Sequence, residues 1–466
     1  MSAGTGEATA PPADTAEARR GAWGTTWLLL TFMLVNFADK TVMGLAADPI
    51  REELGLTRGE FGTAQAAFFA LFSLAALGVS FLTRHVRTTV LLLGMALLWS
   101  AAQLPMLLGA AGFGTLLATR VLLGAAEGPA APVAVHHLHG WFGQRERTLP
   151  TAVLMVGAAG GVAVSAPLLT VVIDVWGWRW AFGSVGLVGL VWAMCWNARG
   201  EEGPLAPLGR RSASSAGSDS SDAESAGSGC ADAGSAACDG SSPSVPYRRL
   251  LLSGTWLTAA LGAFAAYWLL SAGLTWAPDY LHEVSGLSLK QSGAVVTATA
   301  VGNAVVLLTH GLLARRASSK GTAPRLPAGL GGGLVMCVAA MSIAAFAEVD
   351  AVAVKIALMV GPMALTNVIL TVAQTAVARI TPAGQRGVAL GALAFVYALA
   401  GVLSPLVTGR MVDAAASVPA GYHSAYLVMA GLVAVAGVLA VCFLRPEKDA
   451  VRLDVPETPA VGLPAH

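Results

Sequence analysis

The stretch YHSAYLVMAGLVAVAGVLAVCFL, residues 422–444, contains no Asp, Glu, Lys or Arg. A transmembrane helix needs about 20 mostly apolar residues, so this stretch is long enough to cross a bilayer. Eleven further apolar runs of comparable length occur along the chain, at residues 22–47, 59–83, 88–109, 112–138, 148–174, 179–198, 251–281, 291–314, 326–347, 351–378 and 386–411. The pattern predicts an all-α membrane protein with twelve transmembrane helices.

The composition excludes most other classes of protein. Of 466 residues, 55% are hydrophobic and only 12% are charged, whereas a soluble domain carries about 25% charged residues. The 28 Lys and Arg balance the 27 Asp and Glu, so nucleic acid is not expected as a partner. Five cysteines are too few and too scattered for a disulfide framework. The glycine-rich stretch GLGGGL lacks the Lys-Ser/Thr ending of a phosphate loop, and no cofactor is expected.

The runs fall into two sets of six. We expect an N-terminal six-helix bundle over 22–198 and a C-terminal six-helix bundle over 250–445, in a pseudo-symmetric pair. Residues 199–249 between them are rich in Ser, Gly and Ala, a composition typical of a flexible linker. Residues 1–21 and 446–466 are predicted to be disordered tails.

The distribution of Lys and Arg indicates the orientation. With the N-terminus inside, the cytoplasmic segments hold 20 of these residues and the external loops hold 6. Positive residues are retained on the cytoplasmic side of a membrane, so both termini are predicted to be cytoplasmic, in a cell (plasma or inner) membrane. The external set is Arg51, Arg58, Arg179, Lys290, Lys355 and Arg410.

Four ionisable residues interrupt apolar runs: Asp39 and Lys40 in NFADKTVMGLAA, and Arg120 and Glu127 in RVLLGAAEGPAAP. Each costs roughly 2.5–3.5 kcal/mol at a bilayer centre unless it is paired or hydrated. Counted at 1.5 Å per residue from the outer ends of their helices, Lys40 and Arg120 lie at similar depth, and Glu127 lies roughly 10 Å deeper. The spacing predicts a ladder of two acids and two bases between the first and fourth helices.

Such a ladder suits proton-coupled movement of an anion. Lys40 and Arg120 supply positive charge for a carboxylate, which Arg can bind with two hydrogen bonds. Asp39 and Glu127 compete for these cations when ionised, and a proton on them frees the cations for substrate. The alternative is a set of static ion pairs that hold two helices together.

The chain resembles the major facilitator superfamily, and within it the anion:cation symporter branch. The likeness covers nearly all of 25–445, and it is carried by NFADKTVMGLAADPIREELGLTRGEFG, RVLLGAAEGPAAPVA, WFGQRER, GWRWAFGSVGLVGLVWA, TWAPDYL and RGVALGALAFVYALAGVLSPLVTG. The resemblance implies twelve helices, alternating access and import of a small organic anion driven by H⁺ or Na⁺. It also implies that Asp39 and Glu127 bind the driving proton and that Lys40 and Arg120 contact the anion.

Weaker candidates for substrate binding are Asn36, one turn before Lys40, and Gln65 in the second helix; interhelical hydrogen bonds are an equal alternative. Tyr267 and Trp276 resemble the aromatic stretch that packs over substrate in this family, although bundle packing also explains them. Apolar and aromatic residues around Tyr397 replace a polar residue frequent in the family, which points away from a hydroxylated sugar acid.

Two other interpretations stand beside import. The first is a drug or metabolite exporter (H⁺ antiporter), but the fifth helix, VGAAGGVAVSAPLL, lacks the Gly-Pro-Gly-Gly-like signature of exporters. The second is a membrane enzyme, for which no nucleophile–base pair is apparent. His136, His137 and His139 have no Cys or carboxylate at ligand spacing, so no metal site is expected. The predicted protein is a monomeric transporter with no enzymatic activity.

Overall fold

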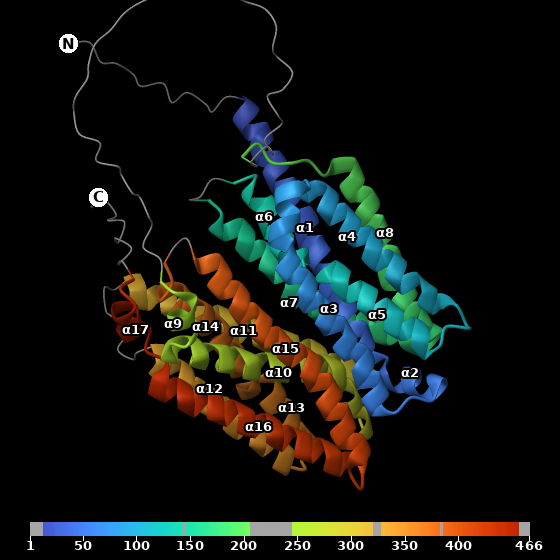
Figure 1. Ribbon diagram of the computed structural model, residues 1–466. Coiled ribbons are helices and arrows are strands. Elements are labelled where there is room, and N and C mark those ends of the chain that lie inside the picture. Colours follow the sequence, from blue (N-terminus) through green and yellow to red (C-terminus); the bar gives the residue numbers. More distant parts are fainter. Residues whose placement is uncertain (1–12, 143–145, 206–244, 320–327, 383–384, 456–466) are drawn as a thin grey trace, which may run out of the picture.

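The first-half helices and the second-half helices form two groups that lie side by side (Figure 1). The computed structural model describes residues 13–142, 146–205, 245–319, 328–382 and 385–455. Within these ranges the regular structure is helical throughout, without strands. In a bilayer, backbone that faces lipid must have its N–H and C=O groups hydrogen-bonded within the protein, as they are in a helix. The fold class predicted from the apolar runs is therefore confirmed.

The first group contains eight helices and one 3₁₀ segment, Leu104–Leu107. The helices are α1 (Ala13–Leu45), α2 (Ala47–Leu54), α3 (Arg58–His85), α4 (Thr88–Gln103), α5 (Phe113–Glu127), α6 (Ala130–His139), α7 (Thr148–Trp176) and α8 (Trp178–Arg199). The short helix α2 ends at Gly55, whose φ of 64° is left-handed, a conformation that glycine adopts without strain.

The second group contains nine helices and the 3₁₀ segment Pro362–Asn367. The helices are α9 (Tyr247–Leu251), α10 (Gly254–Glu283), α11 (Leu289–Ser319), α12 (Ala328–Glu348), α13 (Val352–Val360), α14 (Val368–Arg379), α15 (Arg386–Ala414), α16 (Val418–Phe443) and α17 (Pro446–Arg452). Helix α10 begins after Ser253, whose hydroxyl accepts a hydrogen bond from the Trp256 amide and so caps the helix.

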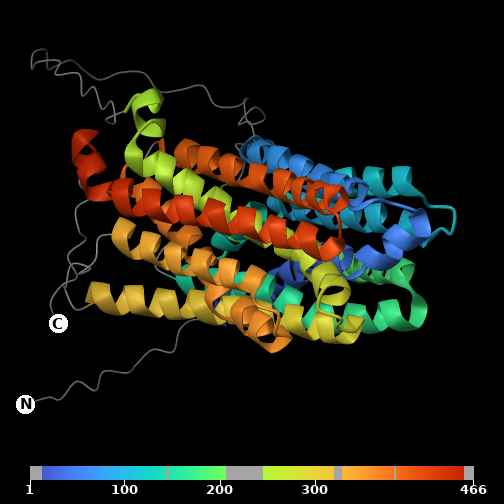
Figure 2. The same ribbon diagram turned by 90° about the horizontal axis from the view of Figure 1, so that it is seen from below.

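Ten helical segments in the described part of the chain are long and apolar enough to cross a membrane. The remaining two predicted crossings correspond to α3 and to the α5–α6 pair. In Figure 2 the helices run roughly parallel, with α2 at the opposite end of the molecule from α9 and α17. Helix α6 lies towards the same end as α9 and α17 (Figure 1). We call this end the α6 end, and the opposite end the α2 end. The predicted topology puts the α2 end outside the cell.

Proline acts in two ways on these helices. The fourth crossing breaks after Glu127, where Gly128 and Pro129 separate α5 from α6. Pro405, by contrast, lies inside a continuous α15. Its missing N–H frees the Gly401 carbonyl, which accepts a hydrogen bond of 3.2 Å from the Ser271 hydroxyl of α10. A neighbouring helix thus satisfies the backbone group that proline leaves unpaired.

The two halves touch most closely near the α2 end. A Cβ atom on Gly44 of α1 would lie 2.1 Å from the Leu274 carbonyl oxygen of α10, and one on Gly62 of α3 would lie 2.5 Å from that of Pro405. Only glycine allows these backbones to approach so closely. Towards the α6 end, α6 and the helices α14 and α15 instead line a cavity of about 670 Å³. The structure is therefore closed at the α2 end and hollowed at the α6 end.

Several boundaries differ from those expected from the sequence. Helix α1 begins at Ala13, inside the segment predicted to be a disordered tail, and α17 occupies part of the predicted C-terminal tail. Residues 199–205, the start of the predicted linker, hold Glu202 against the first turn of α4; most of the linker, 206–244, lies outside the described residues. Lys355, assigned from the sequence to an external loop, is a buried residue of α13 that donates a 2.6 Å hydrogen bond to Tyr280.

Candidate functional site

The centre of the candidate site is an ion pair between Lys40 of α1 and Glu127 of α5. The Lys40 Nζ lies 2.5 Å from Glu127 Oε2, and both side chains are buried, 7% and 0% exposed. The same ammonium donates a hydrogen bond of 2.6 Å to the Asn36 side-chain oxygen one turn earlier. It also lies 4.7 Å and 5.4 Å from the ring centres of Phe37 and Phe72. The cation is therefore held by a carboxylate, an amide and two aromatic rings.

Asp39 is buried beside this pair, at 3% exposure. The charges that act on its carboxyl group are those of Glu127, Arg120 and Lys40. Both of its oxygens lack a hydrogen-bond partner among the described residues, as does Glu127 Oε1. An ionised carboxylate in such a place costs several kcal/mol unless donors or cations surround it. Asp39 is thus a buried acid whose carboxyl group lies against that of Glu127 and has no hydrogen-bond donor in the described part of the chain.

Arg120 of α5 is buried at 1% exposure, and its guanidinium is held by neutral groups. It donates a hydrogen bond of 3.1 Å to Gln103 at the end of α4, and its Cζ lies 5.0 Å from the ring centre of Phe182 of α8. Asp39 and Glu127 act on Arg120 through space, and its Nε donor is left without a partner in the described part of the chain.

All four predicted charges therefore lie in one cluster, but their connections differ from the predicted ladder. The spacing predicts Lys40 level with Arg120. In the structure the long Lys40 side chain reaches Glu127, and Arg120 bonds Gln103 instead. Gln103 and Phe182 were not expected from the sequence, because a lone amide and an aromatic residue in apolar runs carry no signal of their own.

The weaker candidates lie in different places. Gln65 of α3 is buried, and its side-chain oxygen has no partner in the described part of the chain. Tyr267 of α10 packs on Phe69 and on Tyr397, with ring centres 6.1 Å and 5.2 Å apart. Trp276 is 1% exposed and donates a 3.1 Å hydrogen bond to the Pro405 carbonyl, an arrangement typical of interhelical packing.

A chain of aromatic rings connects the cavity with Lys40. Tyr397 lines the cavity and packs on Tyr267, which packs on Phe69. Phe69 in turn contacts Phe72, the ring beneath the Lys40 ammonium. The described lining includes none of the four charged residues, so these rings lie between them and the space that opens at the α6 end.

The histidines near the α6 end do not gather around one point. His136 and His139 line the cavity. His137 faces the other way, is 2% exposed, and shares a hydrogen bond of 2.8 Å with the Thr88 hydroxyl. This separation gives the three side chains different surroundings despite their proximity in sequence.

At the α2 end a second charged cluster joins the two halves. Asp279 of α10 is 1% exposed and accepts hydrogen bonds from Arg51 at 2.5 Å, from Arg58 at 3.2 Å and from the Tyr422 hydroxyl. Arg51 also contacts Asp48 at 2.5 Å. Burial and the neighbouring Asp279 raise the pKa of Asp48 to about 8. The cluster thus brings the carboxyl groups of Asp48 and Asp279 close together and joins the two halves.

Sequence reasoning missed Asp279, although it is an acid within a predicted crossing, in the motif TWAPDYL. Its position two residues before the end of that run resembles a helix boundary. The available signal was a further charge within an apolar run, which by default is a candidate functional residue.

The chain matches the family model of the Major Facilitator Superfamily over residues 28–372. It belongs to this superfamily. The prediction of a major facilitator transporter is thereby confirmed, and the protein is a multi-pass membrane transporter and not an enzyme.

The chain is similar in sequence to several bacterial transporters. The chain is 28% identical to the probable sulfoacetate transporter SauU of Cupriavidus necator, over 88% of this chain and 91% of that protein. It is 24% identical to the D-galactonate transporter of Escherichia coli, over 88% and 93%, and 25% identical to the hexuronate transporter of Bacillus subtilis, over 89% and 92%.

Solved major facilitator structures share the fold. A bacterial homologue of the human lysosomal transporter Spinster, in an inward-facing and unoccupied conformation, matches with a TM-score of 0.72 at 16% identity, over 94% of this chain and 99% of that one. The D-xylose–proton symporter matches with a TM-score of 0.70 at 15% identity, over 91% and 98%. At these identities the likeness concerns the fold.

Proposed function

We propose that this protein imports a small organic anion together with protons by alternating access. The observation that carries the proposal is the buried Lys40–Glu127 pair, with Arg120 held nearby by a neutral amide. The names of the similar transporters, for sulfoacetate, D-galactonate and hexuronate, support an organic anion as the cargo. All three of these compounds carry an acidic group.

In this proposal the proton and the anion act on the same cluster of charged side chains. While Glu127 is ionised, it occupies the Lys40 ammonium. A proton on Glu127 removes that competition and leaves Lys40 and Arg120 as two buried cations, which an anion then neutralises. Asp39, whose oxygens have no donor in the described part of the chain, is the second acid able to take a proton. Proton and anion thus favour each other's binding, which is the linkage a symporter needs.

Arg120 is suited to contact the anion directly. A guanidinium presents five donors in a plane that matches a carboxylate or a sulfonate edge. Gln103 uses one donor, and Phe182 covers a face of the group, so the side chain is oriented before the anion arrives. Such preorganisation lowers the entropy cost of binding.

The closed α2 end and the cavity at the α6 end support the proposed alternating access. With the predicted orientation, this arrangement faces the cytoplasm. Transport then requires the contacts of Gly44 and Gly62 with the second half to separate, while the walls of the cavity approach one another. The fixed charge cluster between the two ends would be reached from either side in turn.

The surroundings of the charges favour a compact anion with few hydroxyl groups. Five aromatic residues lie between the cavity and Lys40 or beside it: Phe37, Phe69, Phe72, Tyr267 and Tyr397. A sugar acid needs a hydrogen-bond partner for each hydroxyl that is desolvated. We therefore expect sulfoacetate to be taken up in preference to D-galactonate or a hexuronate.

The experiment is uptake of labelled anions into proteoliposomes under an imposed gradient. Sulfoacetate, D-galactonate and D-glucuronate are compared, each with an inward H⁺ gradient, with an inward Na⁺ gradient and with none. We expect sulfoacetate to accumulate most of the three with the H⁺ gradient alone, and a protonophore to abolish the accumulation. Accumulation driven by Na⁺ alone, or outward transport only, would contradict the proposal. Exposed Glu447, which pairs with Arg379, provides the control variant Glu447→Gln.

A further inference from the structure

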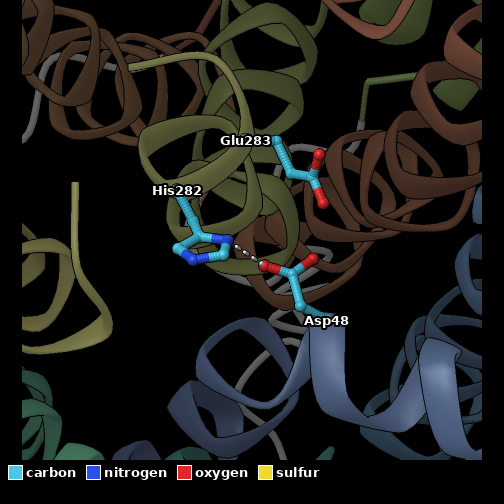
Figure 3. A group of neighbouring side chains, drawn as sticks. All are labelled: Asp48, His282 and Glu283. Carbon is cyan, nitrogen blue, oxygen red and sulfur yellow. Dashed lines mark ion pairs between the residues drawn. The ribbon is translucent and has the colours of Figure 1, made fainter. Parts of the chain in front are cut away.

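Three potential metal ligands converge at the α2 end from both halves of the transporter. Asp48 comes from α2, and His282 and Glu283 come from the end of α10. One ligand atom from each lies within 4.8 Å of the others. Figure 3 shows the His282 ring and the Glu283 carboxylate beside the carboxylate of Asp48, which rises from the first-half helix. We propose that these three side chains form a site for a transition-metal ion such as Zn²⁺, which links the two halves and holds the α2 end closed.

The ligand types suit this class of ion. Zn²⁺ is bound by imidazole nitrogen and carboxylate oxygen, and three protein ligands leave a fourth position for water. Imidazole favours Zn²⁺ and its neighbours over Mg²⁺ or Ca²⁺, which prefer oxygen ligands alone. His282 Nδ1 already lies 3.1 Å from Asp48 Oδ2, a separation close to that of two ligands on one tetrahedral ion with bonds of about 2.0–2.2 Å.

The charges of the surrounding cluster are compatible with a bound cation. Three carboxylates, those of Asp48, Asp279 and Glu283, face two guanidinium groups, those of Arg51 and Arg58. Because the pKa of Asp48 is raised to about 8, a metal ion that binds at neutral pH displaces the Asp48 proton, and with a neutral histidine the cluster then carries one net negative charge. A divalent ion would therefore meet an acidic environment in spite of the nearby arginines.

The arginines keep a buried partner when the metal binds. Asp279 accepts from both of them, at 2.5 Å and 3.2 Å. Glu283, in contrast, lies 4.0 Å from Arg51 and 3.7 Å from Arg58, beyond hydrogen-bond distance. Its carboxylate can turn to a metal without leaving a close hydrogen bond unmade.

The site is open to ions from solution. The side chains of His282 and Glu283 are 51% and 36% exposed, and that of Asp48 is 18% exposed. Because the ligands come from α2 and α10, they approach one another only while the α2 end is closed. An ion bound to all three would stabilise this conformation over the opposite one, and it would slow a transport cycle that requires both.

The proposal is tested by measuring Zn²⁺ binding with isothermal titration calorimetry. The purified chain is used in lipid nanodiscs, with any affinity tag removed. We expect one Zn²⁺ per chain, and a Kd at least about tenfold weaker in His282→Ala and in Glu283→Gln, since losing even an outer-shell partner costs 10- to 100-fold. His423→Ala is the matched control, because His423 pairs with Glu348 at 3.1 Å within the second half only. Absence of binding, or equal binding in His282→Ala, would overturn the assignment.

Hydrogen–deuterium exchange tests the link between halves. We expect Zn²⁺ to slow exchange both in α2 and at the end of α10 in the unmodified protein and in His423→Ala, with no change in His282→Ala. Protection of α10 alone would show a site confined to one half and would contradict the proposed bridge. Neither measurement requires transport activity, so the outcome is independent of the proposed symport.

Discussion

Lys40 and Glu127 form a buried ion pair of 2.5 Å between α1 and α5, and Glu127 is the last residue of α5. The helix breaks immediately after it, at Gly128 and Pro129. The acid is therefore fixed by an irregular turn within a membrane crossing, a backbone arrangement that lipid tolerates only where protein or a water-filled space surrounds it. This location supports the proposal that Glu127 takes up the proton and competes with the anion for Lys40.

Glu127→Gln should uncouple the anion from the proton. Glutamine keeps the shape of the side chain but cannot release a proton, and it leaves Lys40 without its carboxylate. We expect accumulation driven by an H⁺ gradient to fall by roughly 5- to 150-fold, the range of typical coupling between two sites. Exchange of labelled for unlabelled anion across the membrane should continue. The result that argues against the assignment is loss of exchange together with accumulation.

Arg120→Ala should weaken anion binding. Hydrogen bonds to charged groups contribute about 1.5–3 kcal/mol, which corresponds to a Kd roughly 10- to 150-fold higher. Gln103→Ala should have a smaller effect, because Gln103 only orients the guanidinium. Binding of the anion that passes the uptake assay is measured by calorimetry, with exposed Lys290→Ala as control. An unchanged Kd in Arg120→Ala would exclude Arg120 as an anion contact.

Gly44→Ala should open the α2 end. The added methyl group would lie 2.1 Å from the Leu274 carbonyl oxygen, a contact that can be relieved by separating α1 from α10. We expect faster hydrogen–deuterium exchange in α2 and slower exchange in α6, because the proposed alternating access opens one end at a time. Gly24→Ala on the same helix has open space for its Cβ and should leave exchange unchanged. Faster exchange at both ends would indicate loosening of the fold and would count against a shift between two conformations.

Glu202→Ala should destabilise the first half in a pH-dependent manner. Burial opposes ionisation, but hydrogen bonds from Thr89 and Thr88 at the start of α4 hold the pKa of Glu202 below its ordinary value of 4.5. Because this pKa is lowered in the folded state, the stabilisation is full above pH 4.5 and disappears as the pH falls through the lowered pKa.

The expected cost of Glu202→Ala at neutral pH is about 1 kcal/mol, as for other helix caps, or a Tm lower by about 2–4 °C. Thermal unfolding at several pH values measures it, with neighbouring, exposed Glu201→Ala as control. The contact would have no capping role if the two variants melted alike at neutral pH.

The transmembrane helices could be predicted from sequence because lipid imposes one strong rule on every crossing. Long apolar runs had to be helices, and four charges within two of those runs were conspicuous for the same reason. Lys40 and Glu127 could therefore be recognised from the sequence alone.

The partners of these charges could not be predicted in the same way. Arg51 and Asp279 are separated by 228 residues, and no periodicity relates positions in different halves. Gln103 holds Arg120 only because α4 and α5 pack together. Lys355 was misplaced because the edge of an apolar run does not reveal that the Tyr280 hydroxyl and the Phe346 ring accommodate a buried ammonium. Interhelical geometry decides these cases.

Asp39 and Glu127 are proposed to carry the proton that drives anion uptake. Proton entry is measured directly with a pH-sensitive dye trapped inside proteoliposomes, while the transported anion is added outside. We expect the unmodified protein to acidify the interior on addition of the anion, and the double variant Asp39→Asn, Glu127→Gln to exchange anion without acidification. Acidification of equal size in the double variant would contradict this role for the two acids.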